Sequence, residues 1–397
     1  YNYNAAGIFV GWDDPQEPFE VKPANRSSRG EIRMGNLYAK YNWIISPKAA
    51  LKFRVSYLMT LMGNQFIETT NFNPAHGLGA EIQGDLLPHR KFDITYGAEF
   101  KWDTGNTKYF GEHKGYTVGL YGQTEYRMTD KLRITPGLRY DRYQLIDGLA
   151  QSLLSPRMGI NYQPFESTIL RASAGSGFRA ATIAERYLDF KNNSVVVESN
   201  PDLKAESSWS YDIGWRQYMT RNWFVELGAF RNDFDNLIEI DLRQSQIDFA
   251  KDIQVSVRFQ NLQQARIQGI ELTTSGMWWN NRLGLKATAT FMDHEDLVTH
   301  EPLTYRPEVI AFINPFVRLG AWEFHADYRY ASRIENVKLF YYDERVPQKV
   351  WNFRMIYHLG NIDFQLAVNN AFDYYYTQIE RTMGEIRNFT VGVTGAF

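Results

Sequence analysis

The sequence lacks cysteine altogether, and it also lacks long hydrophobic runs and an excess of charge of either sign. Without Cys the chain can form no disulfide framework, no thiolate zinc site and no Cys nucleophile. No apolar run reaches about 18 residues, which excludes membrane-spanning helices. The 43 Lys and Arg residues nearly balance the 45 Asp and Glu residues. This balance argues against a nucleic-acid partner, because such proteins usually carry a basic excess.

Catalytic and cofactor motifs are also missing. The sequence contains no G-x-S-x-G, no Walker loop and no H-E-x-x-H, and Gly77-Leu78-Gly79 lacks the third glycine of a dinucleotide fingerprint. We therefore expect a protein that is not an enzyme and that has no resident cofactor or metal. What the chain does contain is 15% aromatic residues in a hydrophilic sequence whose mean hydropathy is −0.43.

Hydrophobic residues alternate with polar ones over long segments. This period of two predicts strands of about 10 to 13 residues, and a tilted strand needs about 9–11 to cross a bilayer. In the six clearest strands, none of the 30 positions of the apolar frame is charged, whereas 11 of the 29 opposite positions are. A charge facing lipid costs about 2–4 kcal/mol near the bilayer centre, which explains why the apolar frame contains no charged residue. The six strands cover residues 51–61, 91–102, 322–330, 350–358, 362–369 and 388–397.

Short turns and long polar stretches alternate along the chain. Eight tight turns separate eight longer stretches, such as 63–77 and 102–114, which is typical of hairpins in an outer-membrane barrel. The spacing predicts 17 complete strands, and residues 1–12 look like the end of one more. A propeller with a repeat of roughly 40 residues is the alternative, but its blades pack four short strands into that length. We therefore predict an all-β, transmembrane antiparallel β-barrel that occupies residues 1–397 as one domain.

Several segments resemble motifs of one particular barrel family. The strand ITPGLRYD, the strand SPRMGINY, a strand that runs into GFRAAT and the segment NPDLKAE resemble motifs of the TonB-dependent outer-membrane receptors, in that order. Each motif alone is weak, but the ordered set is specific. The segments that carry the resemblance are 134–141, 155–162, 170–182, 200–206, 261–272, 305–307, 368–373 and 387–397.

The resemblance implies a receptor in the outer membrane of a Gram-negative bacterium that imports a scarce, large nutrient. A ferric siderophore is the first candidate, and cobalamin, haem, a glycan and a peptide stay open. Energy would come from an inner-membrane TonB complex that acts through a plug domain. Outer-membrane lipid and a surface lipoprotein complete the implied partners, and no nucleic acid is among them. A passive diffusion porin is the alternative function.

Barrels of this family have about 22 strands, and the chain supplies about 17–18 of them without the plug domain. We therefore expect the missing strands and the plug upstream of Tyr1, either in a longer form of this chain or on a companion chain. The resemblance also gives Phe397 the role of the C-terminal aromatic read by the barrel-assembly machinery.

Five arginines fall in the inward frames of the predicted strands. Either they belong to salt-bridge networks, which a polar lumen needs, or they form a seat for acidic residues of the plug, bound in bidentate fashion. They are Arg133, Arg139, Arg157, Arg171 and Arg179.

A second group of candidates lies at the rim with the long loops. Aromatic side chains and Arg are favoured in ligand sites, although an interfacial aromatic belt uses the same residue types. Imidazole could ligate a metal or haem iron, but in haem-uptake members a His lies between the FRAP-like and NPDL-like elements, and residues 180–200 contain none. His76 and His113 also fall at this rim. The ligand-binding candidates are Tyr109, Arg186, Tyr187, Arg243, His294, His300, Tyr305, Tyr341 and Tyr342.

Overall fold

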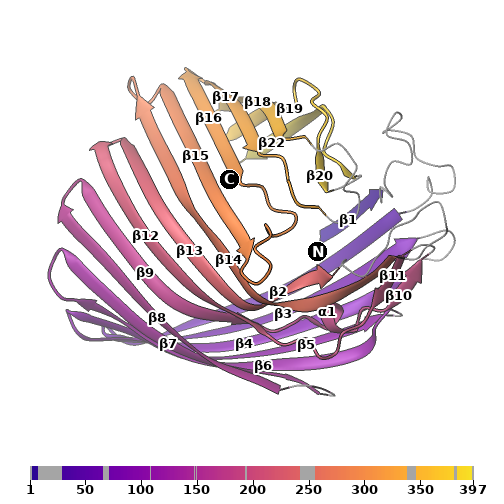
Figure 1. The fold of residues 1–397 in the computed structure, drawn as a ribbon. Coiled ribbons are helices and arrows are strands. Elements are labelled where there is room, and N and C mark those ends of the chain that lie inside the picture. The colour runs from indigo at the N-terminus through magenta and orange to yellow at the C-terminus, as the bar shows by residue number, and fades with distance from the viewer. Residues whose placement is uncertain are drawn as a thin grey trace. The chain divides into compact units, whose positions relative to one another are not determined.

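The computed structural model describes residues 2–7, 29–65, 71–107, 109–146, 148, 150–192, 195–241, 255–337, 346–379 and 382–395 (Figure 1). Most of them lie in β-strands, and the strand pairs described below are antiparallel with one exception. The helix in the described part is α1 (Ile183–Tyr187), with Thr182 and Glu185 forming a reciprocal capping box. No helix of the described residues is long and apolar enough to span a membrane.

Seventeen of the described strands have eight residues or more, which agrees with the number predicted from the spacing. A further strand, β1 (Asn2–Gly7), lies where the remnant was expected. The long strands are β2 (Arg29–Ser46), β3 (Ala49–Gln65), β4 (Asn71–His89), β5 (Phe92–Thr107), β6 (Gly111–Arg127), β7 (Leu132–Leu145), β8 (Ala150–Phe165), β9 (Thr168–Arg179), β12 (Glu206–Thr220), β13 (Trp223–Asp241), β14 (Val255–Trp278), β15 (Leu283–Asp296), β16 (Val309–Leu319), β17 (Trp322–Ala331), β18 (Gln348–Leu359), β19 (Ile362–Asn369) and β22 (Asn388–Gly395).

Many of these strands are longer than predicted. β2 to β6 have 16 to 19 residues and β14 has 24. Two segments expected to be long loops, 63–77 and 102–114, are largely strand. The reason is that pairing between β3 and β4, and between β5 and β6, continues to the strand ends at Asn64↔Asn71 and Thr107↔Gly111.

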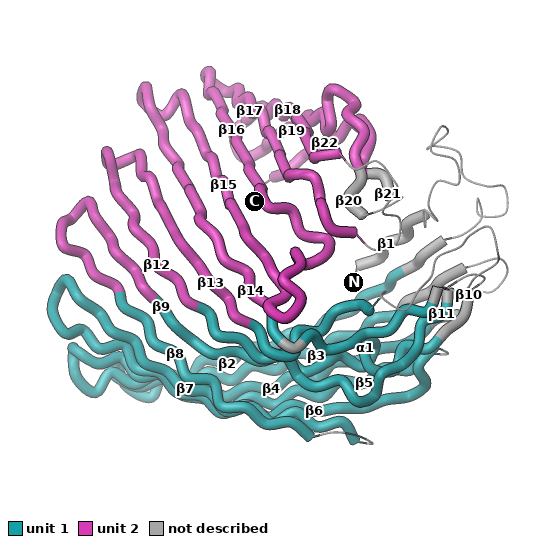
Figure 2. Tube along the Cα trace, viewed as in Figure 1, with its two compact units in different colours: residues 1–160, 173–210, 234–264 teal, residues 161–172, 211–233, 265–397 magenta. Residues whose placement is uncertain are grey.

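The chain divides into two compact units (Figure 2). Unit 1 contains residues 1–160, 173–210 and 234–264, and unit 2 contains residues 161–172, 211–233 and 265–397. In unit 1, β1 to β7 pair in sequence order and antiparallel, as neighbouring strands joined by hairpins do. In unit 2, β14 to β19 pair in the same way, and β22 pairs with β19.

Two predicted turns in unit 2 depend on glycine. Gly320 and Gly360 have φ angles of 63° and 60°, a region that residues with a Cβ rarely adopt. Each glycine begins a two-residue turn between neighbouring strands, β16 to β17 and β18 to β19. The predicted turn at 279–281 is also present, with all three residues at positive φ.

Short strands that the sequence did not predict occur in the loop segments. β10 (Phe190–Asn192) and β11 (Val195–Glu198) form a hairpin in unit 1, and β20 (Thr377–Ile379) pairs with β21 (Thr382–Met383) in unit 2. β11 also pairs with the start of β14 in parallel, from Val195↔Val255 to Glu198↔Arg258.

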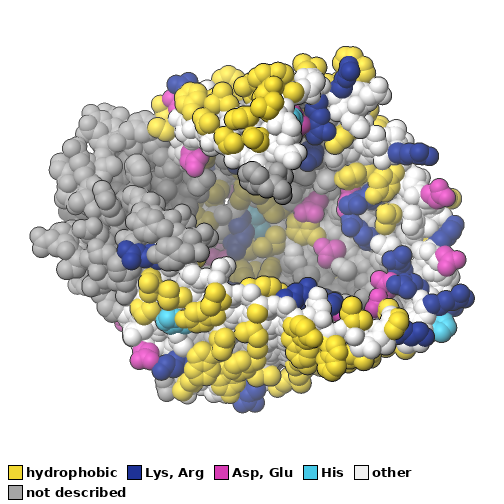
Figure 3. All heavy atoms as spheres, turned by 180° about the vertical axis from the view of Figure 1, so that it is seen from behind, with side chains coloured by type: hydrophobic (Ala, Val, Ile, Leu, Met, Phe, Trp, Pro, Cys, Tyr) yellow, Lys and Arg dark blue, Asp and Glu magenta, His cyan; other side chains and the backbone are white. Residues whose placement is uncertain are grey.

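The strands carry an apolar face with large exposed side chains. On β5, Tyr96 and Phe100 are 43% and 38% exposed, while Glu99 lies in the opposite frame. Figure 3 shows hydrophobic side chains gathered in continuous patches and many Lys, Arg, Asp and Glu side chains clustered apart from them. Apolar side chains exposed in this pattern fit a face that contacts lipid.

Candidate functional site

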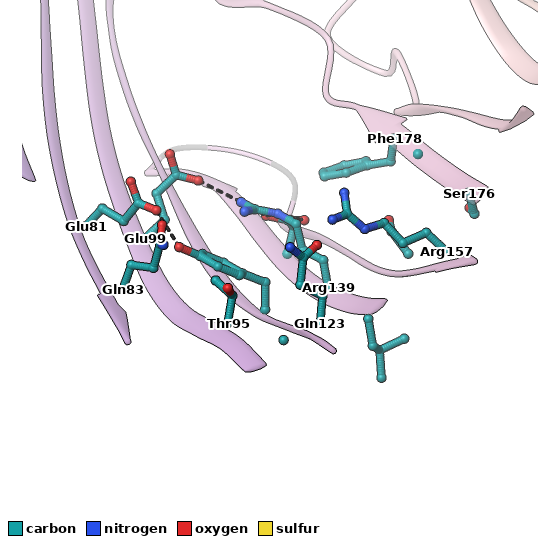
Figure 4. Close-up of a pocket in the computed structure, with 15 residues that line it drawn as sticks. Glu81, Gln83, Thr95, Glu99, Gln123, Arg139, Arg157, Ser176 and Phe178 are labelled. Atoms are coloured by element: carbon teal, nitrogen blue, oxygen red, sulfur yellow. Dashed lines mark hydrogen bonds and ion pairs between the residues drawn. The ribbon is translucent and has the colours of Figure 1, made fainter. Parts of the chain in front are cut away.

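A pocket of about 650 Å³ lies on the polar face of unit 1 (Figure 4). Its walls come from six strands, β4 to β9, and every lining residue belongs to this unit. Its lining side chains include Glu81, Glu99, Tyr121, Gln123, Arg139, Asp141, Arg157 and Phe178.

The pocket has an acidic wall whose carboxylates are all paired. Glu81 and Glu99 lie directly opposite each other on β4 and β5, an arrangement that destabilises a sheet unless cations compensate it. Arg54 lies 3.1 Å from Glu81, and Lys101 lies 2.8 Å from Glu99. The Tyr121 hydroxyl donates a further hydrogen bond to Glu81 at 2.5 Å.

Arg139 completes this wall from β7. Its Nη2 donates to Glu99 at 2.8 Å, and its Nε donates to both carboxylate oxygens of Asp141 at 2.9 and 2.7 Å. Asp141 is only 6% exposed. To reach Glu99, the guanidinium must cross β6, where Gly119 stands opposite both Glu99 and Asp141. A Cβ at Gly119 would collide with Arg139, so the absence of a side chain there makes this ion pair possible.

Arg157 forms the other side of the pocket. Its side chain is exposed, and it has no hydrogen bond or ion pair within the described residues. Figure 4 shows its guanidinium pointing toward Arg139, with the Phe178 ring nearby. A Cβ at Gly137 on β7 would lie 2.9 Å from the Nε of Arg157. The glycine therefore leaves the space that this side chain occupies.

The five predicted lumen arginines thus differ in what they bind. Arg133 lies 3.8 Å from Glu125, Arg139 binds Glu99 and Asp141, Arg171 pairs with Glu226, and Arg179 contacts Glu185 and Glu206 at 2.9 and 2.7 Å. Four of them therefore belong to salt-bridge networks within the chain. Arg157 is the one whose guanidinium has no such partner among the described residues.

Three of the predicted ligand-binding residues lie in one cluster of unit 1. The Tyr109 carbonyl accepts a hydrogen bond from the backbone of Asp189 at 2.9 Å, two residues after Tyr187 at the end of α1. The ring of Tyr187 stacks on that of His113, with centroids 3.8 Å apart and planes 7° from parallel. Arg186, from the same helix, is fully buried, and its Nη1 donates to the Pro201 carbonyl at 2.7 Å.

The segment after α1 is held by asparagine side chains. Asn200 donates from Nδ2 to the Phe259 carbonyl at 2.8 Å. Asn261 accepts from the Lys204 amide at 2.9 Å and donates to the carbonyls of Lys204 and Asn236 at 3.0 and 2.7 Å. These bonds tie the NPDL-like segment to β13 and β14, so its backbone has a defined position beside the cluster.

Other candidates lie in unit 2. His294 is 7% exposed, and its Nε2 lies 3.1 Å from the Arg306 carbonyl. His300 lies 2.6 Å from Glu295. The Tyr305 amide donates to the Asn336 carbonyl at 3.0 Å. Arg243, Tyr341, Tyr342 and Phe397 lie outside the described residues.

Tyr374, in the loop between β19 and β20, is held by Pro347 and Asn370. The Tyr374 hydroxyl donates to the Pro347 carbonyl at 2.8 Å, and burial raises the pKa of this hydroxyl. Asn370, which is 2% exposed, accepts a hydrogen bond from the Tyr374 amide at 2.9 Å. Within the described residues, no group of three or more His, Cys, Asp or Glu side chains could hold a metal ion.

The acidic wall of the pocket was not predicted as a unit. Glu99 and Asp141 share the inward frame with the arginines, but Glu81, Tyr121 and Gly119 were not singled out. The alternation of polar and apolar residues places these residues on the inward face as well. The alternation does not give the register between strands, and the register decides which inward side chains contact each other.

Comparison with known proteins places the fold. The family model described as "TonB dependent receptor-like, beta-barrel" matches residues 3–371. The chain is 28% identical, over 49% of its length, to the hemoglobin and hemoglobin-haptoglobin-binding protein B of Haemophilus influenzae, but it covers only 16% of that protein. It is 23% identical, over 42% of its length, to the ferrienterobactin receptor of Escherichia coli K12, of which it covers 24%.

Solved structures agree in fold. The hemophore receptor HasR of Serratia marcescens, in complex with its hemophore and heme, superposes with a TM-score of 0.74 at 16% identity, over 94% of this chain and 66% of the receptor. The copper transporter OprC gives a TM-score of 0.75 at 16% identity, over 93% and 66%. The chain thus spans about two thirds of these structures and a smaller part of the curated relatives.

Proposed function

Since the chain belongs to the TonB-dependent receptor family through its β-barrel domain, we propose that it forms part of an outer-membrane receptor that binds and imports an iron complex. The family match over residues 3–371 is the observation that carries this proposal. The apolar face of the strands would contact lipid, and the polar face with its paired charges would line the interior. A TonB complex acting through a plug domain would supply the energy, and a surface lipoprotein is a further partner that we propose.

A ferric siderophore is the first candidate ligand. The relatives whose names mention a ligand include the ferrienterobactin receptor of Escherichia coli and the ferric enterobactin receptor of Pseudomonas aeruginosa. The stacked rings of His113 and Tyr187, with the buried Arg186 and the nearby Tyr109, would contribute to ligand recognition at the loop side of unit 1. Stacked rings give a rigid contact surface with polar edges.

Haem is the second candidate, and one contact favours it. The imidazole of His113 lies against the phenol of Tyr187, and both side chains are of a kind that binds haem iron. Hemoglobin-binding proteins of Haemophilus influenzae are among the relatives. His113 lies on β6. It is therefore outside residues 180–200, where the resemblance to haem-uptake receptors would place a haem ligand.

Growth and binding of the full-length receptor test the proposal. Cells that lack the gene should fail to grow on one iron source, either a ferric siderophore or haem, and grow normally on iron salts. The variant His113→Ala should lose haem binding well over tenfold if haem is the ligand, whereas siderophore binding should weaken only about 2- to 10-fold, through loss of the stack with Tyr187. His76→Ala is the matched control, because the His76 ring stacks on Tyr57 and not on Tyr187. Normal growth of the deletion strain on every iron source would reject iron uptake.

A further inference from the structure

Arg186 carries a buried charge for which the described part of the chain provides no counter-charge. Its side chain is fully buried, and the hydrogen bond that this side chain makes runs from Nη1 to the Pro201 carbonyl at 2.7 Å. Within the described residues, Nε and Nη2 have no hydrogen-bond partner, and the guanidinium forms no ion pair. Taking a charge out of water costs several kcal/mol, which an opposite charge can offset.

The unused edge of Arg186 is the one with which other arginines of this protein hold carboxylates. Nε and Nη2 form a planar fork that matches two oxygen atoms of one carboxylate. Arg179 holds Glu206 in this way, at 2.7 Å from Nε and 3.0 Å from Nη2. Arg333 holds Glu335 at 3.0 and 2.8 Å. The same fork of Arg186 has no carboxylate partner among the described residues.

The acidic residues around α1 do not neutralise Arg186. Glu185 precedes it in the helix, but the carboxylate of Glu185 accepts two hydrogen bonds of 2.9 Å from Arg179 and also completes the capping box. Asp103 on β5 acts electrostatically on the hydroxyl of Tyr143, as Arg186 does. Among the described residues, however, Asp103 forms no ion pair with Arg186.

A further donor lies within reach of the Arg186 charge. The Tyr143 hydroxyl on β7 forms no hydrogen bond within the described residues, and the charge of Arg186 acts on it directly. This hydroxyl lies over Gly115 on β6, where a Cβ would be 3.4 Å from the phenol oxygen. Gly115 is itself buried. Nε, Nη2 and the phenol O–H are thus three donors without an acceptor in one covered region of unit 1.

These donors favour a small anion over water and over a large ligand. Water could accept the N–H bonds, but it would leave the charge unbalanced. A large ligand cannot touch Arg186 in this conformation, because the side chain has no exposed surface. A doubly charged anion would suffer more repulsion from Asp103. Chloride or a small carboxylate such as formate matches the single positive charge.

We propose that Arg186 and Tyr143 bind a small monovalent anion, chloride or a small carboxylate, as a built-in part of unit 1. The anion would hold α1 in place. The Tyr187 ring of this helix stacks on His113, so the anion would also keep these two rings together. The site would exist whatever the receptor imports.

Hydrogen exchange of the purified full-length receptor tests the anion site. The amides of Arg186 and Leu188 donate to the carbonyls of Thr182 and Ala184, and they exchange when α1 opens. An anion that binds only the closed form slows this exchange by the factor 1 + [L]/Kd. At about 100 mM, chloride or formate should therefore slow exchange in residues 183–188 at least about fivefold relative to gluconate, which is too large to enter. Exchange in β4 and β5 should not change.

Variants separate an anion site from a purely structural role of the arginine. In Arg186→Met, residues 183–188 should exchange equally fast in all three salts, and no faster than the parent does in gluconate, because a buried charge has been removed. Tyr143→Phe should need about tenfold more anion for the same effect, since one hydrogen bond to the ion is lost. Arg142→Gln is the matched control and should behave like the parent. Arg142 is an exposed arginine on the same strand as Tyr143, with no ion pair within the described residues.

Diffraction keeps the proposal testable even if Arg186→Met does not fold. Crystals of the parent receptor grown in the anion that protects α1, with bromide in place of chloride, should show that ion within hydrogen-bond distance of Nε and Nη2 of Arg186. Three results would overturn the proposal: equal exchange in all three salts, slowing that persists in Arg186→Met, or an ion that binds elsewhere. None of these measurements involves uptake, so a failure of the proposed transport function would be seen separately.

Discussion

The guanidinium of Arg139 lies 2.8 Å from the carboxylate of Glu99, although β6 runs between the two strands that carry them. The contact requires a gap in the side chains of β6, and Gly119 provides it. A charge pair on the polar face thus depends on a residue that has no side chain beyond hydrogen.

Gly119→Val should destabilise the barrel by about 1–3 kcal/mol. The new side chain would occupy the path of Arg139 and separate it from Glu99. The temperature at which the folded form is lost on semi-native gels measures the change. Gly122→Ala, on the same strand, should be nearly neutral, since the nearest atom to its new Cβ lies 4.0 Å away. An equal loss of stability in both variants would show that the space above Gly119 does not determine the stability of the barrel.

Arg139→Gln should be more harmful than Arg133→Gln. Removing Arg139 leaves the buried Asp141 without its cation, and an unsatisfied buried polar group costs about 1–3 kcal/mol or more when it is charged. Arg133 forms a long and exposed pair with Glu125, and such pairs contribute about 0–1 kcal/mol. Urea unfolding of the two variants in lipid vesicles makes the comparison, and the reverse order would contradict the network described here.

Tyr187→Leu should weaken ligand binding while the fold is retained. Loss of the stack with His113 removes about 0.5–1.5 kcal/mol of aromatic interaction, which corresponds to a roughly 2- to 10-fold weaker affinity if the cluster contacts ligand. Tyr187→Phe keeps the ring and should keep most of the affinity for a siderophore. Equilibrium binding to the purified receptor gives the constants. An unchanged affinity in Tyr187→Leu would remove this cluster from the ligand site.

Asn261→Ala should loosen residues 200–206 without unfolding the barrel. The side chain makes three hydrogen bonds, two to Lys204 and one to Asn236, and nothing in alanine replaces them. Hydrogen exchange should become at least several-fold faster in this segment and stay unchanged in β4 and β5. Gln264→Ala serves as the control, because Gln264 on the same strand makes a single bond of 3.4 Å to Asp235.

Most of the fold could be predicted because the period of two is a local property. The 17 long strands and the turns at Gly320 and Gly360 follow from it. α1 could also have been found, since Thr182 and Glu185 have the spacing of a capping box. The extension of β4 back to Asn71 could not be predicted from the sequence. Where both faces of a strand contact water, polar residues occupy both frames, and the alternation that marks a strand is lost.

The site was less predictable, since it depends on register. The sequence marked Arg139 and Arg157 as equivalent inward arginines. Their difference arises because Glu99 and Asp141 lie within reach of one and not of the other, and such distances depend on how strands align across β6 and β7. The parallel pairing of β11 with β14 had no local signal at all.

That parallel pairing has a consequence for loop exchange. Residues 195–198 are hydrogen-bonded along residues 255–258, which are about 60 positions further along the chain. Transplanting one of these segments into another receptor would leave the other without its partner, as an open strand edge. Variation that alters ligand preference at this rim should therefore change the two segments together, and a chimera should carry over both of them or neither.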